Sequence, residues 1–217
     1  MIADPESRAQ AMQIGARPLA VPPAPAALHP YGAGVHPHDT LALSASVVTV
    51  GTFDGVHRGH QTLLKRIVAR ARAAGVASVV YTFDPPPKTV FAGVRQLTPV
   101  AEKIRRLSHF GIDHIVVARF DAAYAARPAE AFLQELARLN PLETWVGADF
   151  RFGRGRSGDV ARLARCFDVR VVSDVACAGG DRISSTRVRS LLAAGREEEA
   201  RHLHGWPREG CLPGTAG

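Results

Sequence analysis

Few cysteines and no long apolar run occur in this chain, and these two absences exclude several classes of protein. Three cysteines are present among 217 residues, Cys166, Cys177 and Cys211, and none belongs to a C-x-x-C pair. A disulfide framework or a cysteine zinc site is therefore not expected. No apolar stretch approaches the roughly 18 residues of a membrane-spanning helix. The N-terminal residues also lack the charged start and apolar core of a secretory signal, so we expect a cytoplasmic protein.

Acidic residues are scarce relative to basic ones. The chain has 27 Lys plus Arg against 20 Asp plus Glu, which gives a formal net charge of +7 and a pI of about 10.0. This balance suits either nucleic acid or a small polyanion such as ATP. The arginines are spread over predicted helices without interleaved aromatic residues, which is typical of solvated helix faces. We therefore expect no nucleic-acid partner and no membrane contact.

Proline is concentrated near the N-terminus. Seven of the fifteen prolines lie within residues 1–44, and this density disfavours regular strand pairing and favours irregular chain. We predict a flexible leader over residues 1–44, one domain over 45–206 and a short flexible tail over 207–217.

From residue 46 onward, short apolar runs alternate with amphipathic helical patterns. Strands are predicted at 46–50, 78–83, 115–118, 143–146 and 169–173, and helices at 61–74, 100–110, 128–139, 157–166, 185–194 and 197–204. Gly75 is expected to end the first helix, and Thr98 to cap the second. The alternation predicts an α/β fold, a Rossmann-like doubly wound parallel sheet that binds ligands at the carboxyl ends of its strands.

The most informative string is GTFDGVHRGH, residues 51–60, which lies between a predicted strand and a predicted helix. A helix start exposes unpaired N–H groups and the positive end of a dipole, so it binds anions such as phosphate. Gly51 and Gly59 let the backbone approach a bulky ligand, and His57 and His60 can donate hydrogen bonds to phosphate oxygens. This pattern resembles the signature of the nucleotidyltransferase superfamily, which transfers a nucleoside monophosphate from a nucleoside triphosphate.

A second string, VGADFRFG at 146–153, follows the predicted fourth strand. Asp149 can accept from a ligand hydroxyl or amide, or hold a metal ion. Phe150 and Phe152 either stack on a flat ring or cover the core. Residues 153–158 also match G-x-G-x-x-G, with Asp174 about twenty residues further on. We reject a dinucleotide fold there because only 59 residues follow Gly158, and we predict a mobile basic loop near phosphate instead.

A third string, ISSTRVR at 183–189, opens a predicted helix. Ser184, Ser185 and Thr186 offer hydroxyls at the helix start, and Arg189 lies one turn further on the same side. This arrangement fits a polyphosphate. An ordinary N-cap followed by an exposed arginine is the alternative interpretation.

Five strings occur in a fixed order: GTFDGVHRGH, YTFDPPP at 81–87, RQLT at 95–98, VGADFRFG and ISSTRVR. Together they resemble the adenylyltransferase (FAD synthetase) module of the bacterial bifunctional riboflavin kinase/FAD synthetase family, over about residues 46–206. The resemblance implies an FMN adenylyltransferase, a transferase of FAD biosynthesis. Such an enzyme moves AMP from ATP to FMN with Mg²⁺ and yields FAD and pyrophosphate.

The resemblance also implies roles for individual residues. His57, His60 and Arg189 are implied as catalytic, with the histidines holding the triphosphate and stabilising its transition state. The implied nucleotide- and flavin-binding positions are Gly51, Thr52, Phe53, Asp54, Gly59, Arg95, Gly147, Asp149, Phe150, Phe152, Ser184, Ser185 and Thr186. Because the FMN phosphate is the nucleophile and is already ionised, no general base is needed, and catalysis rests on positioning and charge neutralisation.

The chain departs from the family pattern in two strings. Thr52 stands where the family usually has Asn, and residues 83–87 read F-D-P-P-P where it usually has F-E-P-H-P. The family would continue after Pro207 into a riboflavin kinase module, so we expect no riboflavin kinase activity. Two other functions stay open, namely transfer to another phosphorylated acceptor and a degenerate nucleotide- or flavin-binding module.

Overall fold

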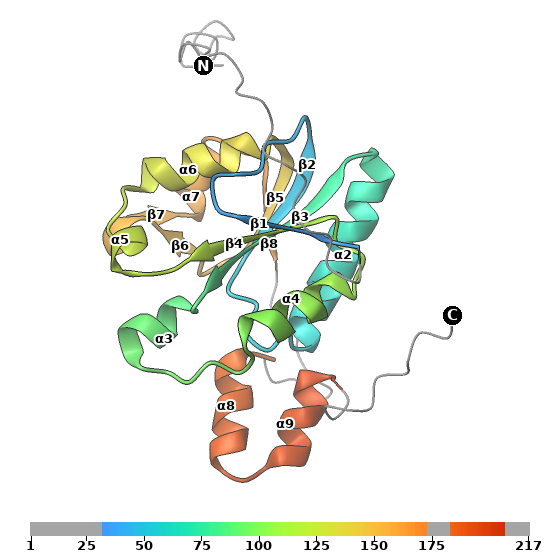
Figure 1. The fold of residues 1–217 in the computed structure, drawn as a ribbon, viewed down its shortest axis with the longest axis vertical. Coiled ribbons are helices and arrows are strands. Elements are labelled where there is room, and N and C mark those ends of the chain that lie inside the picture. Colours follow the sequence, from blue (N-terminus) through green and yellow to red (C-terminus); the bar gives the residue numbers. More distant parts are fainter. Residues whose placement is uncertain (1–31, 173–182, 207–217) are drawn as a thin grey trace, which may run out of the picture.

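The computed structural model describes residues 32–172 and 183–206, and Figure 1 shows a central sheet with helices on both faces. The strands are β1 (Gly34–Pro37), β2 (Ser46–Val50), β3 (Ala77–Asp84), β4 (His114–Arg119), β5 (Pro141–Gly147), β6 (Arg151–Phe152), β7 (Gly158–Asp159) and β8 (Val169–Val172). The helices are α2 (Arg58–Ala74), α3 (Pro87–Ala92), α4 (Val100–Ser108), α5 (Ala122–Ala125), α6 (Ala129–Arg138), the 3-10 turn η2 (Arg154–Arg156), α7 (Val160–Ala164), α8 (Ser185–Ala193) and α9 (Glu197–His204). The predicted tail, most of the predicted leader, Asp174, Cys177 and Cys211 lie outside the described residues.

The main sheet has six strands in the order β1-β4-β3-β2-β5-β8, and all neighbouring strands are parallel. The chain runs outward from β2 through β3 to β4 and then crosses to the other side of β2 to form β5 and β8. The direction of winding therefore reverses between β2 and β5, and ligands bind outside the carboxyl ends of the strands at such a point. The predicted doubly wound α/β fold is confirmed.

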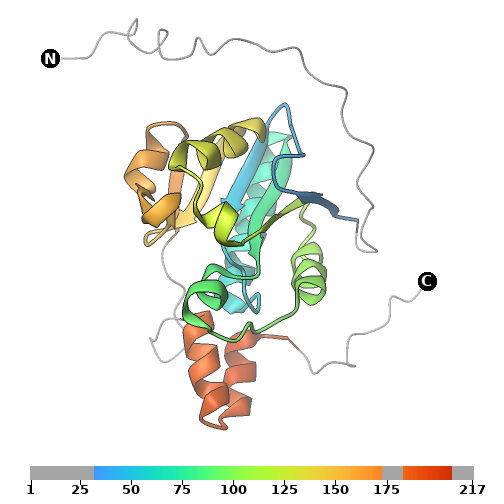
Figure 2. The ribbon, with the colours of Figure 1, turned by 60° about the vertical axis from the view of Figure 1, so that its left-hand side comes forward.

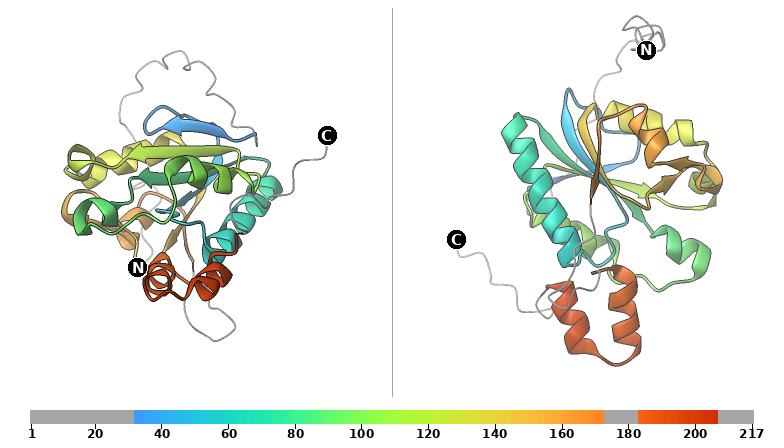
Figure 3. Two further views of the ribbon diagram at one scale, coloured as in Figure 1. Left: turned by 60° about the horizontal axis from the view of Figure 1, so that its bottom comes forward. Right: turned by 180° about the vertical axis from the view of Figure 1, so that it is seen from behind.

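Helices cover both faces of the sheet, as Figure 3 shows. Ile67 of α2 and Leu107 of α4 belong to the apolar cluster on one face, and Leu136 of α6 and Leu163 of α7 belong to the cluster on the other. All five residues of β2 are buried, as expected for a parallel strand that is covered on both sides. This rigid two-sided core fixes the carboxyl ends of β2 and β5.

Strand β1 differs from the prediction of a leader that extends to residue 44. Gly34 pairs with His114 and Pro37 with Val117, so β1 is an edge strand beside β4. Proline is tolerated at the end of an edge strand because its missing N–H need not cost a ladder bond. The prediction is therefore wrong for residues 34–37, and the ordered sheet begins before residue 45.

Local differences also occur around the other predicted elements. Thr98 does not cap α4; its Oγ1 accepts a hydrogen bond from the Gly55 N–H at 3.3 Å, and Pro99 occupies the N-cap position. Helix α7 starts later than predicted and is capped by Asp159, because residues 158 and 159 first pair with β6. Helices α3 and α5 were not predicted. The stretch interpreted as a basic loop, residues 153–158, contains η2 and connects the two short paired strands β6 and β7.

Helices α8 and α9 pack against each other and project beyond the carboxyl edge of the sheet (Figure 2). Their shared apolar cluster contains Val188 and Leu191 of α8 and Ala200 and Leu203 of α9, with Leu97 packed against it. Within the described ranges, no helix is long and apolar enough to cross a membrane.

Candidate active site

A cavity of about 880 Å³ opens at the carboxyl edge of the sheet, where the winding reverses. It is lined by the ends of β2 and β5, the start of α2, the α3 segment, the β6–η2 segment and the start of α8. The predicted site residues that line it are Gly51, Thr52, Phe53, Asp54, His57, Gly59, His60, Gly147, Asp149, Phe150, Phe152, Ser184, Ser185, Thr186 and Arg189. Arg95 does not line it. The Arg95 side chain is exposed, and its backbone carbonyl accepts a hydrogen bond from Arg189 Nε at 2.8 Å.

The two histidines of the first string lie against each other at one end of the cavity. Their rings stack with centroids 3.7 Å apart and an interplanar angle of 16°. His57 is the N-cap of α2, and its Nδ1 accepts a hydrogen bond from the His60 N–H at 3.4 Å. A Cβ at Gly59 would lie 3.2 Å from His57 Nδ1, so glycine there leaves room for the His57 ring.

His60 is held in its neutral form in the free protein. Burial is the main cause that lowers the pKa of His60 well below its ordinary value, and electrostatic interactions with His57, His204 and Lys103 lower it further. Its Nδ1 atom is buried and has no hydrogen-bond partner among the described residues. A bound polyanion would reverse this balance, because negative charge beside the ring favours the protonated form.

Asp54 joins the first and third strings, which are far apart in sequence. Its carboxylate accepts hydrogen bonds from the N–H groups of Leu97 at 2.9 Å and Thr98 at 3.4 Å, and it forms an ion pair with Arg189. Its backbone carbonyl accepts a hydrogen bond from Ser185 Oγ at 2.8 Å. Arg189 therefore lines the cavity while it neutralises a buried carboxylate, a pairing that the sequence did not reveal.

The hydroxyl cluster at the start of α8 caps the helix, but Arg189 is paired with Asp54 and is not the exposed arginine of the alternative interpretation. Ser184 is the N-cap, and its side chain accepts a hydrogen bond from the Arg187 N–H at 3.2 Å. Ser184, Ser185 and Thr186 also line the cavity. The start of α8 thus faces the space beside the histidines, and a helix start there favours an anion.

The other end of the cavity is aromatic. It is lined by Phe83, Phe91, Phe120, Tyr124, Phe132, Phe150 and Phe152. Phe150 and Phe152 stack at 5.6 Å with an interplanar angle of 25°, and Phe152 also packs against Phe132 in the core. Phe152 therefore covers the core, as one of the two interpretations holds, and it also lines the cavity. The residues from α3 and α5 were missed, because no short string marks them.

A buried polar network supports this aromatic end. Glu135 of α6 accepts hydrogen bonds from the hydroxyls of Tyr81 at 2.6 Å and Tyr124 at 3.2 Å. Its other carboxylate oxygen forms an ion pair with Arg127, whose guanidinium lies 4.9 Å from the centre of the Tyr124 ring. Burial, reinforced by these neighbours, raises the pKa of Tyr81 far above its usual value. Arg127 thus presents a fixed cation at the apolar end of the cavity.

Lys103 of α4 binds the backbone where β2 and β3 end, next to the cavity. It is fully buried, and its Nζ donates to the backbone carbonyls of Phe83 at 2.6 Å and Thr52 at 3.5 Å. Burial lowers the pKa of Lys103, while the carboxylates of Asp84 and Asp54 act in the opposite direction. Sequence reasoning missed this residue, because a lysine on an amphipathic helix is ordinarily solvated.

The comparison with known families agrees with this geometry. The family model described as FAD synthetase matches residues 40–187 of the chain. The chain belongs to the FAD synthetase family. It is therefore an FMN adenylyltransferase, a nucleotidyltransferase whose substrates are ATP and FMN.

Named relatives support the family assignment. A Geobacillus thermodenitrificans protein named "Putative bifunctional riboflavin kinase/FMN adenylyltransferase" is 55% identical over 167 residues, which cover 77% of this chain and 93% of that protein. A Listeria monocytogenes FAD synthetase is 35% identical, with coverage of 78% and 74%. The bifunctional riboflavin kinase/FMN adenylyltransferase of Escherichia coli K12 is 39% identical, and the match covers 74% of this chain but 54% of that protein. The chain thus spans about half the length of the E. coli relative.

A solved structure shares the fold. The crystal structure titled as a macrolide-efflux protein from Streptococcus pneumoniae superposes with a TM-score of 0.70 at 30% sequence identity. The superposition covers 80% of this chain and 62% of that one. It supports the arrangement of the sheet and its helices.

Proposed function

We propose that the two ends of the cavity bind the two substrates, with ATP at the histidine end and FMN at the aromatic end. The observation that carries this proposal is the chemical difference between the two ends of one cavity. Stacked His57 and His60 face the start of α8 at one end, and a wall of aromatic rings lies at the other. A polyphosphate suits the first end, and a flat isoalloxazine ring suits the second. The FMN phosphate then lies between them, beside the α-phosphorus of ATP.

The proposed reaction is an in-line displacement at phosphorus. An oxygen of the FMN phosphate attacks the α-phosphorus of ATP, the bond from that phosphorus to the bridging oxygen breaks, and pyrophosphate leaves with the electron pair. The attacking phosphate is already ionised, so no group has to remove a proton from it. His57 and His60 donate hydrogen bonds to the phosphate oxygens, and the N–H groups at the start of α8 stabilise the same charge.

Mg²⁺ is proposed to bind together with ATP. Asp149 lines the cavity at the end of β5 with an exposed carboxylate, and Mg²⁺ commonly takes one or two carboxylates together with substrate phosphates. Asp54 is a poorer ligand, because Arg189 and two backbone N–H groups already occupy it. No group of three potential metal-ligating side chains was found among the described residues, so phosphate oxygens would supply most of the coordination. The ion would neutralise phosphate charge.

Thr52 and Pro86, which both depart from the family pattern, line the cavity, and we propose that the site accepts FMN with these residues in place. The excess of basic residues serves substrate phosphates rather than nucleic acid. We place the protein in the cytoplasm because ATP is its donor substrate. We also propose that the domain extends from β1 to Trp206.

The test is an assay of FAD formation from ATP, Mg²⁺ and FMN. FAD is measured by chromatography, and pyrophosphate release is measured in parallel. We expect turnover to fall at least about a hundredfold in His60→Ala, because removal of one donor to developing charge has an effect of this order. His202→Ala is the matched control, because His202 is an exposed histidine on α9 that does not line the cavity. Unchanged turnover in His60→Ala would refute the assigned role. Pyrophosphate release with another phosphorylated acceptor but not with FMN would refute the acceptor.

A further inference from the structure

The loop that carries the histidines has an unfavourable backbone conformation. Three of its residues have positive φ angles, 46° at Phe53, 83° at Gly55 and 46° at Val56. Glycine adopts such angles readily, but phenylalanine and the β-branched valine do so rarely. A conformation of this kind persists only where the surrounding structure imposes it. The contacts that hold this loop therefore help to decide where His57 lies.

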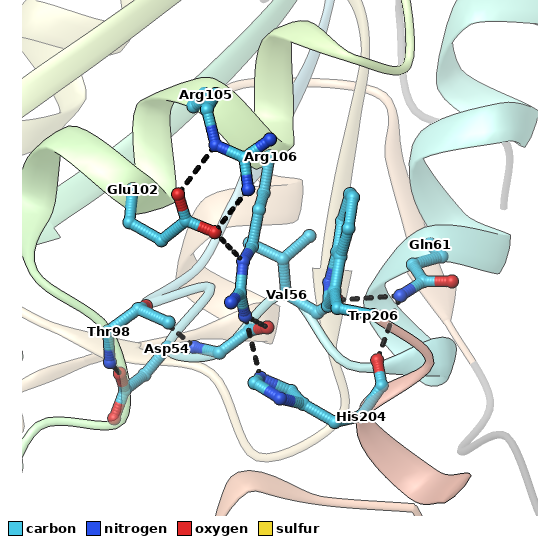
Figure 4. A network of polar contacts seen from close by, with 10 residues as sticks. Asp54, Val56, Gln61, Thr98, Glu102, Arg105, Arg106, His204 and Trp206 are labelled. Carbon is cyan, nitrogen blue, oxygen red and sulfur yellow. Dashed lines mark hydrogen bonds and ion pairs between the residues drawn. The ribbon is translucent and has the colours of Figure 1, made fainter. Parts of the chain in front are cut away.

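Side chains from distant segments hold the peptide groups of the loop (Figure 4). The Gly55 carbonyl accepts from Arg106 Nη1 of α4 at 3.0 Å. The Val56 carbonyl accepts from Gln61 Nε2 of α2 at 2.9 Å and from Trp206 Nε1 at 2.8 Å. A buried carbonyl gains from each such donor and loses free energy when none remains.

Arg106 is itself fixed from three directions. Its Nε donates to Glu102 at 2.5 Å, its Nη1 contacts His204 Nε2 at 2.9 Å, and its guanidinium lies 5.2 Å from the centre of the Trp206 ring. Burial, with the added charge of Arg106, lowers the pKa of His204 to about 4. The His204 ring is therefore neutral at neutral pH and can accept a hydrogen bond from Arg106. A buried guanidinium with these partners is a rigid donor to the loop.

Trp206 follows the end of α9 and lies against the loop at Val56. Gly205 ends α9 with a φ of 74°, and a Cβ there would lie 2.8 Å from the Arg58 side chain, so glycine permits this close turn. Trp206 is buried and packs edge-on against the rings of His109 and Phe110. Gln61 also binds the His204 carbonyl at 2.9 Å. The end of α9 is thus attached to both α2 and α4.

We propose that Arg106, Gln61 and Trp206 are positioning residues that fix His57 and His60 through the peptide groups of Gly55 and Val56. The Val56 carbonyl belongs to the peptide bond that supplies the nitrogen of His57. A rotation of this peptide displaces the His57 ring, which caps α2 and stacks on His60. None of the three positioning residues lines the cavity, so they act on catalysis without contacting substrate. The inference rests on the proposed function of the histidines.

Two variants test this inference in the full chain. Trp206→Phe keeps an aromatic ring but removes the N–H donor to Val56, and Gln61→Met removes the other donor at similar length. We expect kcat for FAD formation to fall about tenfold or more in each, because a small misplacement of catalytic groups costs rates of this order. The Kd for FMN, measured by flavin fluorescence, should stay within about twofold, because the aromatic end is untouched.

Trp145→Phe is the matched control. Trp145 donates its indole N–H to Glu143 at 3.0 Å on β5 and does not line the cavity. This control removes the same chemical group and should leave kcat near that of the parent chain. The ring signals of His57 and His60 in ¹H–¹³C NMR spectra should shift in Trp206→Phe and Gln61→Met but not in Trp145→Phe.

Either of two results would overturn the inference. One is a kcat within about twofold of the parent in both variants together with unmoved histidine signals; the other is an equal loss of kcat in Trp145→Phe. If Trp206→Phe does not fold, Gln61→Met decides. If the parent chain makes no FAD, the proposed function fails, and the histidine signals still decide whether these residues position the rings.

Discussion

Removal of the guanidinium of Arg189 should destabilise the protein because it leaves a buried carboxylate without its counterion. The Asp54 side chain is 2% exposed and that of Arg189 is 18% exposed. Breaking a buried ion pair by removing one partner costs roughly 3–5 kcal/mol. Because Arg189 retains some contact with water, we expect the lower end of this range, about 3 kcal/mol, for Arg189→Met. In a chain of this size, this loss corresponds to a fall in Tm of roughly 6–12 °C.

A double-mutant cycle separates this structural role from the proposed catalytic one. Asp54→Asn keeps an oxygen that can accept from the N–H groups of Leu97 and Thr98, but it leaves Arg189 without its carboxylate. We expect Asp54→Asn to cost about 2 kcal/mol. The double variant contains neither charge, so its total loss should be smaller than the sum of the single losses by about 2 kcal/mol.

The free energy of unfolding of the four proteins is measured by urea denaturation at pH 7, and FAD formation is measured in parallel. If Arg189 contacts the triphosphate, the double variant should be no less stable than Arg189→Met alone but stay about a hundredfold less active than the parent. Additive stability losses, with a coupling below about 0.5 kcal/mol, would refute the ion-pair reasoning. Activity of the double variant near that of the parent would show that Arg189 has no direct catalytic role.

Three further predictions follow from individual contacts. In Gly158→Ala, the new Cβ would lie 2.5 Å from the Phe152 ring, so the ring must move by about 1 Å. The free energy of unfolding should fall by about 1–3 kcal/mol, and KM for FMN should rise. An unchanged KM in steady-state kinetics would contradict this prediction. Because the pKa of the buried His60 is lowered in the free protein, the negative charge of bound ATP should raise it, and ATP binding should take up a proton. The affinity for ATP should then rise as pH falls from 8 to 6. Binding heats that are identical in buffers of different ionisation enthalpy would disprove this proton uptake. The pKa of His204 is about 4 in the folded protein against an ordinary value of 6.5. Between these two pH values the unfolded chain binds a proton at His204 that the folded protein does not, so the free energy of unfolding should fall by roughly 2 kcal/mol between pH 7 and 4.5. His204→Gln should show a shallower fall in urea titrations.

Short-range patterns predicted much of the fold. The apolar β-branched run over residues 46–50 is β2, and Gly75 ends α2 with a left-handed φ of 65°. Such features depend on the residues themselves and on neighbours within one turn. The edge strand β1 was missed because proline density outweighed its short apolar content, and its pairing partner His114 lies about 80 positions away. Helix α3 was missed because the prolines before it indicated an end to regular structure.

In the candidate site, too, local strings were predicted and contacts between distant residues were missed. The three strings around His57, Asp149 and Ser185 were found in sequence because each follows a strand or opens a helix with characteristic residues. Arg95 was assigned to the site, but the structure uses only its backbone carbonyl. Arg127 and Lys103 were not assigned, because their roles depend on partners that are distant in sequence.

Local sequence is enough to specify the doubly wound fold, the family and the strings that contribute to the cavity, because these depend on periodicity and on residues that are adjacent in the chain. How those strings meet depends on the tertiary structure, which pairs Asp54 with Arg189, Gly55 with Arg106, and Val56 with Trp206. These contacts join residues that are 51 to 150 positions apart. Their geometry follows from the packing of whole helices on the sheet, which no short stretch of sequence specifies.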